Sequence, residues 1–281
     1  MNEAFIVPPG APVKLSSIDP GNTGGYRSRE ETGKEHKRLL KKLEELQEPL
    51  FAGKKHAVLF VFQGMDCSGK DGVINHVFSA VNPQGLLTYS FKTPTAEEAT
   101  HDFLWRAHSR IPGKGYIATF NRSYYEDVLI TRVHRTISDQ EAARKFDQIN
   151  AFEQLLMDSG VKVVKIFLHI SKAFQLEKLI DRIETPHKNW KFDAGDLTER
   201  KSWDLYQSYY EDIFERCSSP ELPWHIVPAD HRWYRDFAVL QIVVSTLEGL
   251  GLSFPEPKPE LKELLPELYR ERGVEKEKKE K

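Results

Sequence analysis

A glycine-rich segment after a run of apolar residues has the spacing of a phosphate-binding loop. Gly64 is followed, after four residues, by Gly69 and Lys70. Glycines let the backbone curl so that successive N–H groups point at one anion, and the lysine reaches outer phosphate oxygens. An ordinary strand-to-helix turn is the alternative, but the position between an apolar run and a helical pattern favours phosphate binding. We expect the other loop residues to contact phosphate or nucleotide as well: Met65, Cys67, Ser68 and Asp71.

The loop departs from the common pattern at the residue after its lysine. Asp71 follows Lys70, where a serine or threonine hydroxyl normally coordinates magnesium. Asp66, inside the loop, is therefore a candidate metal ligand, because a carboxylate among phosphate-binding amides is unfavourable unless a cation lies beside it. Capping of the following turn is the alternative role for Asp66.

A second polar cluster follows the apolar run at residues 116–120. It contains Asn121, Arg122, Glu126 and Asp127. Ligands of open parallel sheets bind beyond the carboxyl ends of strands, so this cluster can share a crevice with the loop. Arg122 is suited to stabilise charge on a transferring phosphoryl group, and Glu126 and Asp127 are candidate Mg²⁺ ligands. Ser123 precedes Glu126 by three residues, so a helix-capping role for Glu126 stays open.

Basic residues are concentrated next to these motifs. Residues 103–135 contain six lysines and arginines against two acids, which predicts a track for a polyanion, with a solvated basic face as the alternative. A second basic run, at residues 182–193, is interrupted by Pro186 and is typical of a lid over phosphates. Packing of Trp190 is expected to close this lid, and stacking of Trp190 on a base is the alternative. The residues expected to guide a phosphate chain or close the lid are Arg106, Arg132, His134, Arg182, Lys188 and Lys191.

These motifs require elements that alternate along the chain. Short apolar runs at residues 57–62, 87–91, 116–120, 163–170 and 224–227 predict buried parallel strands. Helical spacing is found at residues 29–51 (ending near Pro49), 71–80, 96–108, 139–158, 171–183 and 198–216. The alternation indicates one α/β domain over residues 29–253, with a lid at about 184–197. Residues 1–28 read as an irregular arm and residues 254–281 as a charged tail.

The composition excludes several classes of protein. Forty Lys and Arg face 42 Asp and Glu among 281 residues, which argues against a basic nucleic-acid coat protein, and we expect no nucleic-acid partner. No stretch is long and apolar enough to span a membrane. The only two cysteines, Cys67 and Cys217, indicate a reducing compartment, by default the cytoplasm.

Taken together, the motifs resemble those of the polyphosphate kinase 2 family. The similarity covers about residues 26–236 and rests on the loop at 63–72, the segments 91–98 and 101–106, the cluster at 121–134 and the lid residues 186–191. Members of this family have aspartate at the position of Asp71, whereas Thr185 here replaces an aspartate that usually precedes the lid proline.

The resemblance implies a fold and an activity. The implied fold is a P-loop kinase-like, thymidylate-kinase-like three-layer sandwich with a five-stranded parallel sheet and a helical lid. The implied reaction is reversible Mg²⁺-dependent phosphoryl transfer (Mn²⁺ being an alternative ion) between inorganic polyphosphate and AMP or ADP, with guanine nucleotides left open. A homodimer or homotetramer is implied as well.

The residues suggest a mechanism without an obvious covalent nucleophile. Lys70 and Arg122 would stabilise charge while Asp66 and Asp127, with Glu126 helping, hold one or two metal ions. An ATP-dependent nucleoside or nucleotide kinase on the same fold remains the alternative. A GTPase switch is disfavoured because the chain has no Asn-Lys-x-Asp base reader.

Overall fold

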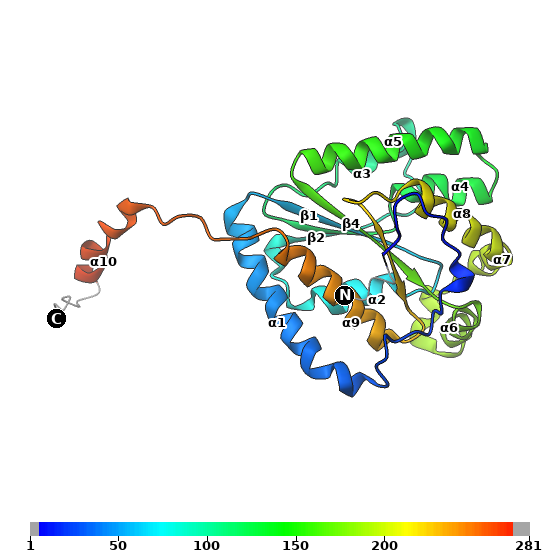
Figure 1. Ribbon diagram of the computed structural model, residues 1–281, viewed down its shortest axis with the longest axis horizontal. Coiled ribbons are helices and arrows are strands. Elements are labelled where there is room, and N and C mark those ends of the chain that lie inside the picture. The colour runs from blue at the N-terminus through cyan, green and yellow to red at the C-terminus, as the bar shows by residue number, and fades with distance from the viewer. Residues whose placement is uncertain (1–5, 272–281) are drawn as a thin grey trace.

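A computed structural model of the chain describes residues 6–271. Its centre is a sheet of five parallel strands in the order β2-β3-β1-β4-β5 (Figure 1). In chain order, the strands are β1 (Ala57–Gln63), β2 (Leu86–Ser90), β3 (Ile117–Asn121), β4 (Val161–His169) and β5 (Trp224–Pro228). The predicted α/β fold with a five-stranded parallel sheet is confirmed, and every predicted strand is present within two residues of its expected bounds.

Helices cover both faces of this sheet and make three layers (Figure 1). One face carries α1 (Arg29–Gly53), α2 (Lys70–Val77) and α9 (Arg232–Glu248), which pack against one another. The other carries α5 (Asp139–Asp158), which packs on β4, and α8 (Trp203–Arg216), whose Tyr210 and Phe214 contact Phe167 of β4. Apolar residues on both faces of the central strands explain why β1 is an unbroken buried run.

Three predicted helices differ from the structure. The helix expected at 96–108 is reduced to the 3-10 turn Glu98–Thr100 and the single turn α3 (Trp105–His108), because the Asp102 carboxylate accepts hydrogen bonds from Leu104 N and Trp105 N and forms a local turn. The helix α1 continues through Pro49, which is buried. The helix expected at 198–216 is divided at Ser202 into α7 (Gly195–Lys201) and α8.

The two flanking segments behave differently. The arm packs along the edge strand β5, where Val7 N donates to Trp224 O at 2.9 Å, and Leu15 is buried. The tail extends away from the domain and carries the short helix α10 (Leu265–Glu271) (Figure 1). None of the helices within residues 6–271 is long and apolar enough to cross a membrane.

Candidate active site

The phosphate loop joins β1 to α2 at the carboxyl edge of the sheet. Gly64 and Gly69 have φ angles of +148° and +87°, which side chains strongly disfavour, and Cys67 is also left-handed at +68°. A Cβ on Gly64 would lie 2.8 Å from both the Leu168 carbonyl and the Ser68 hydroxyl. The two motif glycines are therefore required by backbone conformation and by close contacts.

Lys70 is folded back onto this loop. Its buried ammonium donates to the Gly64 carbonyl at 2.8 Å and to the Met65 carbonyl at 3.2 Å. Burial, followed by the positive charge of Arg122, lowers the pKa of Lys70 to about 8. The lysine thus stands inside the loop with a charge that a nearby phosphate would stabilise.

Phosphate binding at pH 8 is expected to draw a proton onto Lys70. The anion raises the lysine pKa from about 8, so a ligand that needs the ammonium takes up about half a proton at this pH and binds more weakly as the pH rises above it. Titration calorimetry of tripolyphosphate with Mg²⁺, in two buffers of different ionisation enthalpy, measures this uptake. Lys70→Met is the control for the ligand's own protonation, and equal uptake by the variant and the wild type would contradict the assignment.

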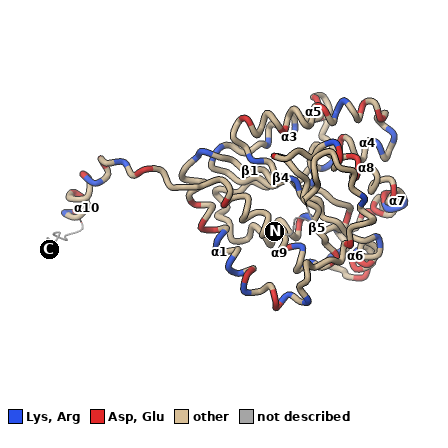
Figure 2. The backbone as a smooth tube through the Cα atoms, in the orientation of Figure 1, with Lys and Arg blue, Asp and Glu red and all other residues tan. Residues whose placement is uncertain are grey.

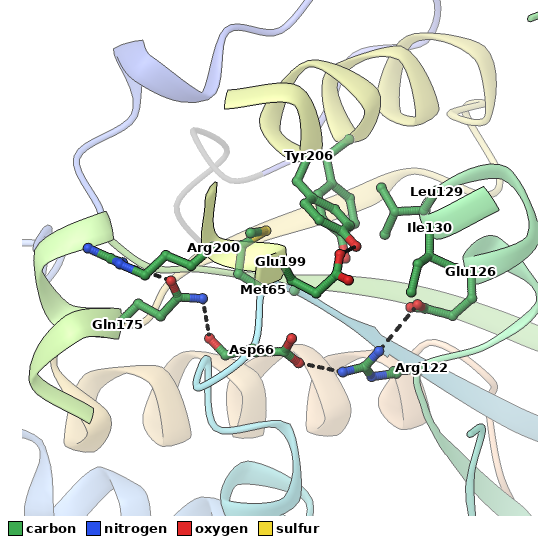
Figure 3. A pocket seen from close by; sticks show the side chains of 12 residues that line it. Met65, Asp66, Arg122, Glu126, Leu129, Ile130, Gln175, Glu199, Arg200 and Tyr206 are labelled. Carbon is green, nitrogen blue, oxygen red and sulfur yellow. Dashed lines mark hydrogen bonds and ion pairs between the residues drawn. The ribbon is translucent and has the colours of Figure 1, made fainter. Parts of the chain in front are cut away.

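The second cluster faces the loop through Arg122. Its guanidinium forms ion pairs with Asp66 and, at 3.4 Å, with Glu126, and all three side chains line one pocket (Figure 3). The nearby Glu126 carboxylate, together with Asp66, raises the pKa of Arg122 above its usual range against the opposing effect of burial. The sequence-based expectation that these two motifs share a crevice is confirmed by this contact.

The capping alternative for Glu126 is wrong. Ser123 accepts a hydrogen bond from Tyr125 N, at the start of the 3-10 helix Tyr124–Val128, but the Glu126 carboxylate reaches Arg122. Asp71 also has a partner in this cluster, because Asn121 Nδ2 donates to its carboxylate at 2.6 Å. The two motifs are thus joined by hydrogen bonds at two separate points.

Asp127 points elsewhere. Asp127 does not line the pocket. Its carboxylate instead pairs with Arg106 Nη2 at 3.2 Å. Burial raises the pKa of Asp127, although Arg106 opposes this effect. The predicted role of Asp127 as a metal ligand beside Asp66 stays a prediction.

Two arginines of the predicted basic track are paired with acids in the structure, and the track itself stays a prediction. Arg106 is only 6% exposed and donates to the Lys92 carbonyl as well as to Asp127. Arg132 pairs with Asp212 and Asp139. The charges of these two arginines are thus offset by neighbouring acids, and Figure 2 shows acidic and basic segments interspersed around α4 (Ile130–Val133), α7 and α8.

The lid region is formed by the end of α6 (Lys172–Glu184), the 3-10 helix Pro186–Lys191 and α7. Lys188 pairs with Asp181 at 2.8 Å, and Arg182 pairs with Asp196 at 2.9 Å. The expectation that Trp190 packs the lid shut is wrong in this structure, because 79% of its surface is exposed, and the Lys191 ammonium lies over its ring. His134 joins the lid through Glu199 at 2.8 Å.

Sequence reasoning missed one wall of the pocket, which opens to solvent. Gln175 donates to the Asp66 carbonyl at 3.0 Å and accepts from Arg200, so it ties α6 and α7 to the loop (Figure 3). The residues of α6, α7 and α8 on this wall are Gln175, Glu199, Arg200, Tyr206 and Tyr210. Their spacing carries no motif, so no sequence signal identifies them.

The donor set of the pocket fits a magnesium ion that is bound mainly by phosphate. Asp66 and Glu126 supply hard carboxylate oxygens, and both are partly accessible. No group of three or more His, Cys, Asp or Glu residues that could hold a metal is found within residues 6–271. Magnesium is commonly held by one or two carboxylates plus substrate phosphates and water, which is the arrangement that this pocket allows.

Comparisons with known proteins agree with this geometry. The family model described as "Polyphosphate kinase 2 (PPK2)" matches residues 26–253. The AMP/ADP-polyphosphate phosphotransferase of Meiothermus ruber is 42% identical over 255 residues, which cover 90% of this chain and 96% of that protein. The ADP-polyphosphate phosphotransferase of Rhodopseudomonas palustris is 44% identical over 253 residues, 85% and 88% of the two chains. The crystal structure of polyphosphate kinase 2 from Arthrobacter aurescens superposes with a TM-score of 0.88 at 39% identity, covering 93% and 95% of the two chains.

Proposed function

Because the chain belongs to the polyphosphate kinase 2 family, we propose that it transfers a phosphoryl group from inorganic polyphosphate to AMP or ADP. The observation that carries the proposal is the ion pair between Arg122 and Asp66 of the phosphate loop, which places Arg122 in the pocket beside the loop onto which Lys70 is folded. The names of the two relatives above supply the donor and the acceptors.

The chain's own residues account for positioning and for charge. Loop amides and the α2 N-terminus bind phosphate oxygens, and Lys70 exchanges its carbonyl partners for the phosphate. Arg122 releases Asp66 or Glu126 and stabilises negative charge on the phosphoryl group in transfer. A bound Mg²⁺ would neutralise phosphate charge as a Lewis acid. Asp66 and Glu126, which line the pocket, are the residues proposed to hold it. Asp127, which does not line the pocket, stays a further candidate ligand.

Three further assignments extend the proposal. Guanine nucleotides are proposed as additional acceptors, in line with the kinase fold. A homodimer or homotetramer is proposed as the assembly. Two free cysteines, one of them buried, support a cytoplasmic location.

The phosphoryl donor, polyphosphate or ATP, distinguishes this function from that of an ATP-dependent kinase. Wild-type protein with Mg²⁺, polyphosphate and AMP, ADP, GMP or GDP in separate reactions, without ATP, is expected to form the nucleotide with one more phosphate. Quantification of nucleotides by anion-exchange chromatography gives the acceptor preference. Reactions without polyphosphate, and reactions in which ATP replaces it, are the controls. Product from ATP and nucleosides but none from polyphosphate would establish the alternative kinase.

A further inference from the structure

A buried arginine contacts the back of the phosphate loop from outside the pocket. Arg235 belongs to α9, and its side chain is 3% exposed. Its Nη1 donates to the Ser68 carbonyl at 3.3 Å. A Cβ on Gly69 would lie 1.9 Å from this nitrogen, and one on Gly72 would lie 3.5 Å from Nη2. The absence of side chains at these two positions leaves the space that the guanidinium fills.

The guanidinium is held in place by a chain of hydrogen bonds. Arg235 Nε and Nη2 donate to one Asp236 carboxylate oxygen at 2.9 and 2.6 Å. The other oxygen of Asp236 is 2.7 Å from Nδ1 of His76, which belongs to α2. These hydrogen bonds therefore connect the loop to α9 and α9 to α2, the helix that follows the loop. The Arg235 side chain consequently has little freedom to turn.

The structure assigns to Arg235 a positioning role in the phosphate loop, exerted through the Ser68–Gly69 peptide. The peptide is trans, and in a trans peptide the C=O and N–H groups point in opposite directions. Because Arg235 holds the Ser68 carbonyl on the α9 side, the Gly69 N–H is directed away from α9. An amide that is oriented before the anion arrives needs no reorganisation on binding. The assignment rests on the proposed function in one respect, namely that this loop binds phosphate.

Arg235→Met tests the assignment on the full-length chain. We expect kcat/KM with polyphosphate and ADP to fall about 10²-fold, as for other displacements of binding groups. We also expect the Kd of Mg²⁺-tripolyphosphate, measured by calorimetry, to rise at least about tenfold, since the Gly69 amide loses its orientation. Arg232→Met is the matched control, because it makes the same change at an exposed position on the same helix. Wild-type affinity in the Arg235→Met variant overturns the assignment.

A second variant separates positioning from folding. Removal of Arg235 alone leaves the Asp236 carboxylate partly buried without its cation, which destabilises the protein. The double change Arg235→Met with Asp236→Asn removes both charges, so its melting temperature is expected to recover while tripolyphosphate binding stays weak. Recovery of affinity together with stability would show a purely structural role.

A third variant tests whether the guanidinium must reach Ser68 and Asp236 at the same time, and the binding assay tests whether the loop binds phosphate. Arg235→Lys keeps a charge that reaches one acceptor, so it is expected to recover part of the affinity, and no recovery relative to Arg235→Met contradicts the assignment. Tripolyphosphate binding needs no turnover. Wild-type protein that binds it but forms no ADP or ATP would refute the proposed function alone, whereas wild-type protein that does not bind it would refute both.

Discussion

Replacement of Lys70 by alanine is expected to lower kcat/KM about 10²-fold or more, the size of effect found when one transition-state contact is lost. The lysine ammonium lies within the loop and bonds to the Gly64 and Met65 carbonyls, so it is placed to exchange these partners for phosphate. Steady-state kinetics with polyphosphate and ADP measure the loss.

The Lys70 variant should remain folded. Burial lowers the pKa of Lys70, which means that the folded protein disfavours its charge, so removal of the ammonium relieves a cost while it removes hydrogen bonds. Lys172→Ala, at an exposed position on α6, is the matched control and is expected to keep wild-type rates. A Lys70→Ala protein with near-normal turnover would exclude the phosphate-loop assignment.

The second large effect is expected for Asp66→Asn. Amide replaces carboxylate at nearly constant size, which weakens metal binding and leaves Arg122 with Glu126 as its remaining acid in the pocket. We expect about a 10²-fold loss of rate at low Mg²⁺ and a rise of at least about tenfold in the Mg²⁺ concentration that gives half-maximal rate. A Mg²⁺ titration of initial rates measures both quantities.

Asp127→Asn is the matched comparison. The sequence alone predicts a loss of about 10²-fold here too, but the carboxylate pairs with Arg106 and does not line the pocket. We therefore expect the Mg²⁺ requirement to shift less than in Asp66→Asn. An equal or larger shift in Asp127→Asn would show that Asp127 holds the metal directly.

Local chemistry explains which parts of the site were predictable. The loop could be read from sequence because Gly64 and Gly69 are required by their own backbone angles, and Lys70 by its place at the start of a helix. The prediction of a helix at 96–108 was wrong because the spacing of apolar residues does not reveal that the Asp102 side chain competes for backbone N–H groups.

The basic track shows why a count of charges is insufficient. The sum over residues 103–135 says nothing of which acids lie near each base in space. Asp212, 80 residues from Arg132 along the chain, pairs with it at 2.7 Å. The prediction that Trp190 packs the lid shut was wrong for a similar reason. The sequence around an aromatic residue does not show which distant side chains it packs against.

The sequence by itself determined the alternating α/β fold, the phosphate loop and the family, because these depend on neighbouring residues and on hydrophobic period. Only the tertiary structure decided which charges remain available in the pocket. It placed Gln175 against the Asp66 carbonyl and Arg235 against Ser68, across separations of 109 and 167 residues. Such contacts depend on how distant helices pack on the sheet, and no local spacing encodes that packing.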